Sequence, residues 1–183
     1  MNDKLADIRL LLLDVDGVMT DGGILYDANG VETKVFNVKD GHGIKMLQRH
    51  GIEVGIITGR TSPVVDIRAR ELGIELLYQG ALKKIESYLD VKRRTGLIDS
   101  QIAYMGDDVI DVPVMRRVIF AAAPADALID ARNAAHYVTS LAGGRGAVRE
   151  VCDLILKGRG LWDEVVARYE LPNGNHTISV PKK

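Results

Sequence analysis

The stretch LLLLDVDGVMTDGG, residues 10–23, passes from four leucines directly into two aspartates and a glycine-rich segment. A short apolar run that ends at acidic groups is typical of a strand buried on both faces, whose carboxyl end lies at a ligand-binding edge. We therefore expect Asp14 and Asp16 to follow the first strand of a parallel sheet. Further strands of the same kind follow along the chain.

Apolar runs and helical patterns alternate over most of the sequence. The runs predicted as strands are residues 8–14, 53–58, 74–78, 101–106 and 117–122. The patterns predicted as helices are residues 41–51, 62–73, 81–96 and 108–118. Ser62 and Pro63 form a typical helix start, and Gly51, Gly73 and Gly96 stand where helices should end. Because the strands are continuously apolar, we predict a doubly wound, Rossmann-like α/β fold with a parallel sheet.

Two segments depart from this alternation. Residues 22–41 contain two short β-rich runs around DANG, and the Asn-Gly pair predicts a projecting β-hairpin followed by a loop. Residues 147–170 resemble two amphipathic helices interrupted at GRG, and residues 172–183 are polar with two prolines, as in a mobile tail. We expect one domain over residues 1–171, with that tail after it.

Composition narrows the class of protein. The chain has 183 residues, 46% of them hydrophobic, and a net charge of −1. This balance is typical of a globular protein and gives no basis for nucleic-acid binding. Cys152 is the single cysteine, no apolar run is long enough for a membrane helix, and Asp3 and Asp7 argue against a signal peptide. We expect a cytoplasmic protein with no membrane partner.

Polar groups follow four of the predicted strands. Asp14 and Asp16 follow the first, Thr58 to Arg60 the second, Lys84 comes a few residues after the third, and Asp107 and Asp108 follow the fourth. Carboxylates without histidine or cysteine between them suit a hard cation such as Mg²⁺, with Asp14 and Asp107 as anchors. A carboxylate can also attack phosphorus if a metal and cations neutralise the phosphoryl charge, a role open to Thr58 and Lys84. Asp16, two residues after Asp14, is placed to donate a proton to the leaving alcohol and to accept one from the incoming water.

Four segments in order resemble the motifs of haloacid dehalogenase (HAD) superfamily phosphatases: DVDGVMT, ITGR, the lysine of QGALKK, and GDDVID. The resemblance implies that Asp14 is the nucleophile, Asp16 the acid and base, and Thr58 and Lys84 further catalytic groups. It implies Mg²⁺ as the cofactor, with Asp14, Asp16 and Asp107 as metal-binding residues. The segment between Asp14 and Thr58 is filled by a hairpin and a helix, so no cap domain is expected, and neighbouring subunits would shield the site.

A more specific resemblance, to the 3-deoxy-D-manno-octulosonate 8-phosphate phosphatases, lies in DVDGVMTDG, FNVKDGHGIK, GDDVIDVPVM and AGGRGAVREVCDLIL. It implies hydrolysis of that sugar acid phosphate to 3-deoxy-D-manno-octulosonate (KDO) and phosphate through an aspartyl-phosphate, in lipopolysaccharide precursor biosynthesis. It also implies a homotetramer with active sites near subunit interfaces. The substrate-binding residues that it implies are Asn37, Lys39, Asp40, Gly41, Lys45, Gly59, Arg60 and Arg68. Asp108, Asp111 and Arg145 are expected to support the site.

Other interpretations stay open at this point. Arg68 could pair with Glu71 or Asp66 on a helix surface, and Asp108 and Asp111 could cap a helix. The substrate could be a nine-carbon sugar acid phosphate. A phospho-accepting receiver domain is also doubly wound, although its acidic pair and phosphorylated residue follow other strands. A noncatalytic assembly module is a third alternative, against which the intact motifs argue.

Overall fold

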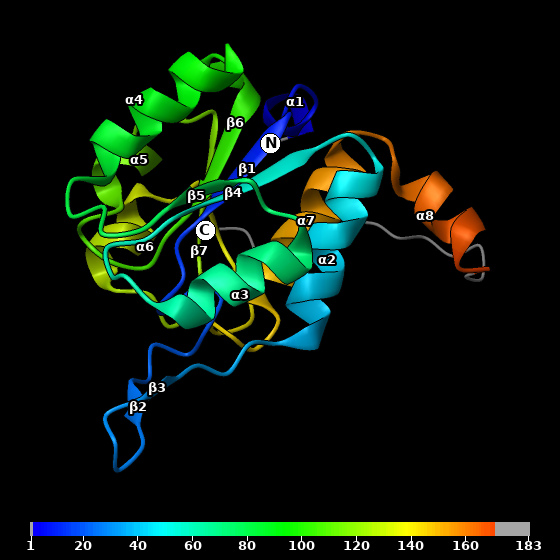
Figure 1. The fold of residues 1–183 in the computed structure, drawn as a ribbon. Coiled ribbons are helices and arrows are strands. Elements are labelled where there is room, and N and C mark those ends of the chain that lie inside the picture. Colours follow the sequence, from blue (N-terminus) through cyan, green and yellow to red (C-terminus); the bar gives the residue numbers. More distant parts are fainter. Residues whose placement is uncertain (1, 171–183) are drawn as a thin grey trace.

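The computed structural model describes residues 2–170 and contains a six-stranded parallel sheet with helices on both faces (Figure 1). The order of strands across the sheet is β5, β4, β1, β6, β7 and β8. Their bounds are β1 Leu10–Leu13, β4 Glu53–Ile57, β5 Leu76–Tyr78, β6 Ile102–Met105, β7 Phe120–Ala123 and β8 Tyr137–Val138. All neighbouring strands pair in parallel, which confirms the predicted doubly wound fold.

The leucines of β1 explain the two layers of helices. Leu11 and Leu13 belong to one buried cluster and Leu10 and Leu12 to the other, because successive side chains of a strand point to opposite faces. The first cluster packs under α2 (Val38–Arg49), α3 (Pro63–Leu72) and α7 (Ala147–Gly158). The second packs under α4 (Lys84–Thr95), α5 (Val112–Met115) and α6 (Ile129–Ala134). The shorter elements are α1 (Asn2–Leu5), η1 (Asp99–Gln101) and α8 (Trp162–Arg168).

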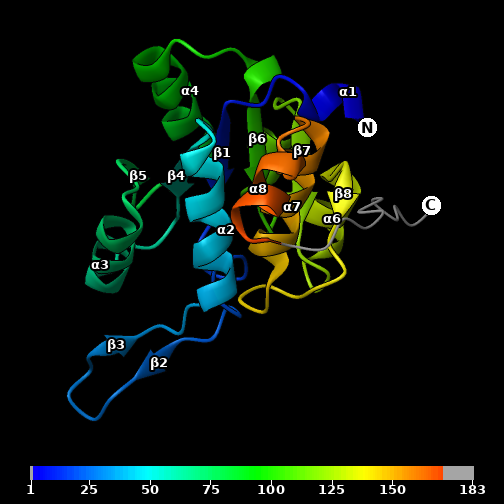
Figure 2. The same ribbon diagram turned by 90° about the vertical axis from the view of Figure 1, so that its right-hand side faces the viewer.

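The predicted hairpin is confirmed. Strands β2 (Leu25–Tyr26) and β3 (Glu32–Thr33) pair antiparallel and project from the same end of the molecule as the amino end of α2 (Figures 1 and 2). The turn closes at Gly30, whose positive φ of 78° favours glycine. Among the described residues, this two-stranded sheet is the only insertion between β1 and α2, so the absence of a cap domain is also confirmed there.

Several boundaries were predicted wrongly. The helix expected over residues 108–118 covers only Val112–Met115, because residues 107–111 form a loop around the Asp111 carboxylate. Helix α2 begins at Val38 and not at residue 41, because the Asn37 side chain accepts a hydrogen bond from the Lys39 backbone at its first turn. Strand β8 and helix α6 were not predicted.

The predicted tail, residues 172–183, lies outside the described residues. Within residues 2–170, no helix combines the length and apolar character that crossing a membrane requires.

Candidate active site

The carboxyl ends of three adjacent strands bring the candidate groups together. Strand β1 lies between β4 and β6, so Asp14, Thr58 and Asp107 follow neighbouring strands. They line a cavity of about 250 Å³, whose walls are Asp14, Asp16, Gly17, Gly22, Thr58, Gly59, Arg60, Asp107, Asp108 and Ile110. Strand ends that the sequence separates by many residues therefore meet at one concave surface, as expected for a parallel sheet.

Lys84 contacts two buried carboxylates, that of Asp14 in the cavity wall and that of Asp111 outside the cavity lining. Its Nζ lies 2.6 Å from Asp14 Oδ2 and 2.6 Å from Asp111 Oδ1, and its side chain is fully buried. Burial acts to lower the pKa of Lys84, but the two carboxylates outweigh burial and raise that pKa. By contrast, the neighbouring Lys83 is 78% exposed and pairs with Glu86. Of these two lysines, the structure directs Lys84 into the site.

Asp111 holds the loop that follows β6. Its Oδ1 accepts hydrogen bonds from Lys84 Nζ and, at 2.6 Å, from the Tyr104 hydroxyl. Its Oδ2 accepts the backbone N–H groups of Asp107 and Asp108, each at 3.1 Å. Both oxygens are thus committed to the protein, and Asp111 positions its neighbours. Tyr104 was missed by sequence reasoning, because a tyrosine inside an apolar strand gives no signal of a polar contact.

The acidic cluster suits a divalent cation. Asp14, Asp107 and Asp111 each bring one carboxylate oxygen to within 4.8 Å of the others. Asp107 Oδ1 is buried and lacks a hydrogen-bond partner among the described residues. Gly17 permits this approach, because a Cβ at its φ of 83° would lie 2.1 Å from Asp107 Oδ2. Since Asp111 is already saturated by hydrogen bonds, the residues that fit Mg²⁺ are Asp14 and Asp107.

Charge crowding shows in the pKa values. Burial raises the pKa of Asp14 to about 6, although the Lys84 ammonium acts to lower it. Burial, followed by the carboxylates of Asp14 and Asp111, raises the pKa of Asp107 to about 7. Two carboxyl groups that resist ionisation side by side are the arrangement that a cation would relieve.

Asp16 faces the hairpin. Its Oδ1 accepts a hydrogen bond from Lys34 Nζ, and its Oδ2 lies 3.6 Å from Arg60 Nε. Arg60 Nη2 donates to Glu32 Oε1 at 2.6 Å and to the Tyr26 hydroxyl at 3.3 Å. The Asp16 carboxylate does not join the three clustered carboxylates, so its assignment as a metal ligand stays a prediction. Lys34, Glu32 and Tyr26 were missed, because hairpin residues of these types are usually solvent-exposed.

Thr58 and Gly59 complete the wall beside β4. The Thr58 side chain is buried, and its backbone is fixed between the Tyr78 carbonyl and the Ala81 N–H. Asp108 lines the rim, where its Oδ1 accepts the Val109 N–H. These placements agree with the predicted positions of the motif residues and leave their chemical roles as predictions.

Six predicted substrate-binding residues and Arg145 lie outside the lining of this cavity. Asn37 caps α2 and donates to the Gly144 carbonyl at 3.2 Å. Asp40 Oδ1 accepts the Arg149 N–H at the start of α7, and Lys45 donates to the Leu72 carbonyl at the end of α3. Of the remaining four residues, Lys39 is exposed and Gly41 lies against the Arg68 guanidinium. Arg68 pairs with Glu71, and Arg145 pairs with Asp21.

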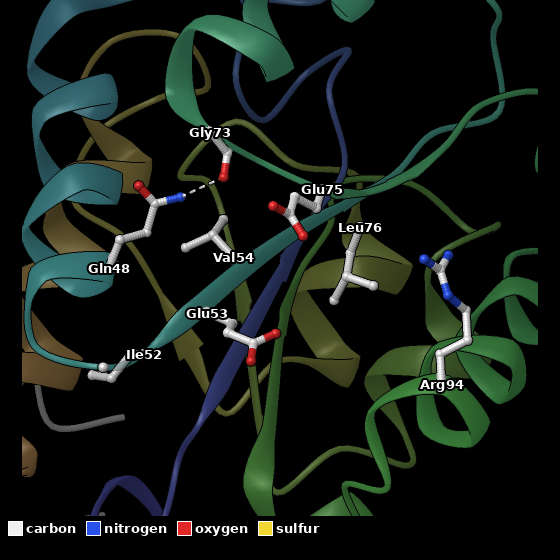
Figure 3. Close-up of a pocket in the computed structure, with 9 residues that line it drawn as sticks. Gln48, Ile52, Glu53, Val54, Gly73, Glu75, Leu76 and Arg94 are labelled. Atoms are coloured by element: carbon white, nitrogen blue, oxygen red, sulfur yellow. Dashed lines mark hydrogen bonds between the residues drawn. The ribbon is translucent and has the colours of Figure 1, made fainter.

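A second cavity, of about 550 Å³, lies at the opposite end of the sheet (Figure 3). Its walls come from α2, from the amino ends of β4 and β5 and from α4, and include Gln48, Glu53, Glu75, Leu76 and Arg94. Although it is larger, it holds no buried cluster of acidic and basic groups among the described residues. Ligands in open parallel sheets bind at the carboxyl ends, so the smaller cavity is the candidate active site.

A capless parallel sheet with this set of acidic and basic groups at its strand ends is the architecture of the HAD superfamily. No family model matches the chain. The chain is 50% identical to 3-deoxy-D-manno-octulosonate 8-phosphate phosphatase KdsC of Escherichia coli (strain K12) over 161 residues, which cover 88% of this chain and 86% of that protein. The chain belongs to the family of 3-deoxy-D-manno-octulosonate 8-phosphate phosphatases.

Solved structures of phosphatases from this family have the same fold as this chain. The phosphatase of this family from Yersinia pestis has a TM-score of 0.87 at 48% identity, covering 88% of this chain and 88% of that chain. The Moraxella catarrhalis phosphatase, solved in complex with a magnesium ion, a phosphate ion and KDO, has a TM-score of 0.90 at 40% identity, covering 92% of this chain and 97% of that chain.

Proposed function

We propose that this protein is a Mg²⁺-dependent phosphatase that hydrolyses 3-deoxy-D-manno-octulosonate 8-phosphate to KDO and phosphate. One observation carries the proposal: Asp14 after β1, Lys84 at the start of α4 and Asp107 after β6 lie close together. A relative with the same fold holds magnesium, phosphate and KDO, which are the cofactor and the two products of this reaction.

In the first half-reaction, a carboxylate oxygen of Asp14 attacks phosphorus as the ester P–O bond breaks. Asp16 donates a proton to the departing sugar oxygen, which leaves as the alcohol. In the second, Asp16 accepts a proton from water, whose oxygen attacks phosphorus and restores the Asp14 carboxylate. The Lys84 ammonium offsets the negative charge of the phosphoryl group throughout, and the Thr58 hydroxyl donates a hydrogen bond to a phosphoryl oxygen. Bound Mg²⁺, held by Asp14 and Asp107 and by Asp16 as predicted, would supply further charge neutralisation.

The proposed substrate-binding residues are those that the resemblance to this phosphatase family implies. Gly59 and Arg60 line the cavity, and the planar guanidinium of Arg60 suits a carboxylate or phosphate. Asp108, Asp111 and Arg145 are proposed to support the site. The other six residues, Asn37, Lys39, Asp40, Gly41, Lys45 and Arg68, are proposed to bind substrate as the family resemblance implies, although they lie outside the cavity lining.

We further propose that residues 1–171 work as one domain of a cytoplasmic homotetramer in lipopolysaccharide precursor biosynthesis. The hairpin supports the assembly, because Ile24, Leu25, Tyr26, Val31 and Val35 are each at least half exposed. A two-stranded sheet of this size is marginal alone, and apolar side chains on it favour packing against another chain.

The test is phosphate release from a panel of eight-carbon and nine-carbon sugar acid phosphates, with and without Mg²⁺. Asp14→Asn should lower Mg²⁺-dependent release by at least about 10³-fold while circular dichroism stays unchanged, because the nucleophile is lost. Asp163→Asn, at an exposed position of α8, is the matched control. Undiminished release by Asp14→Asn would refute the mechanism, and preference for a nine-carbon substrate would refute the substrate assignment.

A further inference from the structure

Lys34 is a buried cation at the end of a hairpin that is mostly exposed. It follows β3 directly, and its side chain is 1% exposed, whereas residues 21–31 are all exposed. A buried ammonium is costly unless it is paired. Lys34 has two carboxylate partners, Asp16 Oδ1 and, at 3.5 Å, Glu32 Oε1. The hairpin thus reaches back to the loop that follows β1.

Four charged side chains form a closed arrangement there. Lys34 contacts one oxygen of Asp16, and Arg60 Nε approaches the other at 3.6 Å. Glu32 Oε1 lies near both cations, at 3.5 Å from Lys34 Nζ and 2.6 Å from Arg60 Nη2. Arg60 is 40% exposed and too distant from Asp16 for a hydrogen bond. Lys34 therefore provides the only short side-chain contact to Asp16 among the described residues.

We propose that Lys34 is a positioning residue that fixes the Asp16 carboxyl for proton transfer to the leaving sugar oxygen. The proposal rests on the role of Asp16 in the proposed function. Displacement of a catalytic group by about 1 Å can cost about 10²-fold in rate, and Asp16 stands on a loop rather than in a strand. On this account the hairpin takes part in the reaction as well as in assembly.

The test compares ester substrates that differ in their need for a proton. A sugar alcohol leaves only with a proton, whereas the nitrophenolate of p-nitrophenyl phosphate leaves without one. In Lys34→Met, kcat/KM for the sugar acid phosphate should fall about 10²-fold, and kcat/KM for the aryl ester should stay within about threefold. Lys34→Arg should recover part of the loss, and Lys83→Met, at an exposed lysine, should behave as wild type.

A second readout separates positioning from substrate binding. If Asp16 is displaced, water attack on the phosphorylated Asp14 also slows, so Lys34→Met should release a burst of nitrophenolate equal to the enzyme concentration. Loss of kcat/KM for the sugar ester without this burst would overturn the proposal, because Lys34 would then contact the substrate itself. Equal losses with both esters by a folded variant would overturn it as well.

The aryl ester also controls for folding, since its turnover needs Asp14. If Lys34→Met does not fold, Lys34→Ala, whose side chain cannot reach Asp16, is judged by the same two readouts. Failure of the proposed function is distinguishable: wild type would then hydrolyse the aryl ester but no sugar acid phosphate, while the burst in the Lys34 variant would still report on Asp16.

Discussion

Burial decides the chemistry of the acidic residues at the strand ends. The pKa of Asp14 is raised to about 6 and that of Asp107 to about 7, from an ordinary value of 3.8. Between about pH 4 and pH 7, the folded protein without a bound cation therefore holds protons that the unfolded chain has released. The stability that these groups contribute is complete below about pH 4 and is lost as the pH rises to about 7.

Magnesium should reverse this trend. Because the ion binds ionised carboxylates, its binding releases protons below about pH 7 and tightens as the pH rises. We expect Mg²⁺ to raise the thermal unfolding midpoint more at about pH 8 than at about pH 5.5. Differential scanning calorimetry with and without Mg²⁺ at the two pH values measures the difference. Asp107→Asn should abolish it, and equal midpoint shifts at both pH values in wild type would contradict the assignment.

Residues that directly follow strands could be placed from the sequence. Asp14, Thr58 and Asp107 each stand at the end of an apolar run, and strand ends in a parallel sheet converge. The partners of these residues could not be placed. Tyr104 reaches Asp111 from within β6, and Lys34 reaches Asp16 across a hairpin. Such contacts depend on the register and twist of elements, for which a single sequence carries no local signal.

At the scale of elements, predictions succeeded where the backbone itself enforces a boundary. Helices α3 and α4 end at Gly73 and Gly96, both in the left-handed conformation. The predictions of element boundaries failed where a tertiary contact sets the boundary, as in the loop that Asp111 holds before α5. Strand β8 has only two residues, Tyr137 and Val138, and its pairing with β7 supplies the order that its own sequence lacks.

Helix α7 depends on a residue from another helix. Its N-cap position is Gly146, which has no side chain, and the Asp40 carboxylate of α2 accepts the Arg149 N–H at 2.8 Å instead. Asp40→Ala should therefore lower the free energy of unfolding by about 1 to 2 kcal/mol. Asp40→Asn keeps an acceptor oxygen and should lower the free energy of unfolding by only about 0.3 kcal/mol. Urea unfolding of both variants measures this, and equal losses would contradict the capping role.

At the scale of the whole molecule, the two ends of the sheet have different surroundings. The hairpin projects from the active-site end (Figure 1), and its apolar side chains are exposed. The amino ends of the strands carry the larger cavity (Figure 3). The small active-site cavity opens at the carboxyl ends of the strands, where the described residues form no cap domain. A neighbouring subunit packed on the hairpin would both bury its apolar surface and narrow that opening.

The proposed tetramer can be tested on the hairpin alone. Leu25 and Val31 are 52% and 59% exposed, so a Leu25→Glu, Val31→Glu variant leaves the fold of the described chain without a clash or cavity. Carboxylates buried in an interface without partners would cost several kcal/mol, enough to dissociate subunits at micromolar concentration. Analytical ultracentrifugation should show wild type as a tetramer and the variant as smaller species. Ile98→Glu, 58% exposed before the amino end of β6, should remain tetrameric. A tetramer that survives both hairpin charges would mean that the subunits associate through another surface.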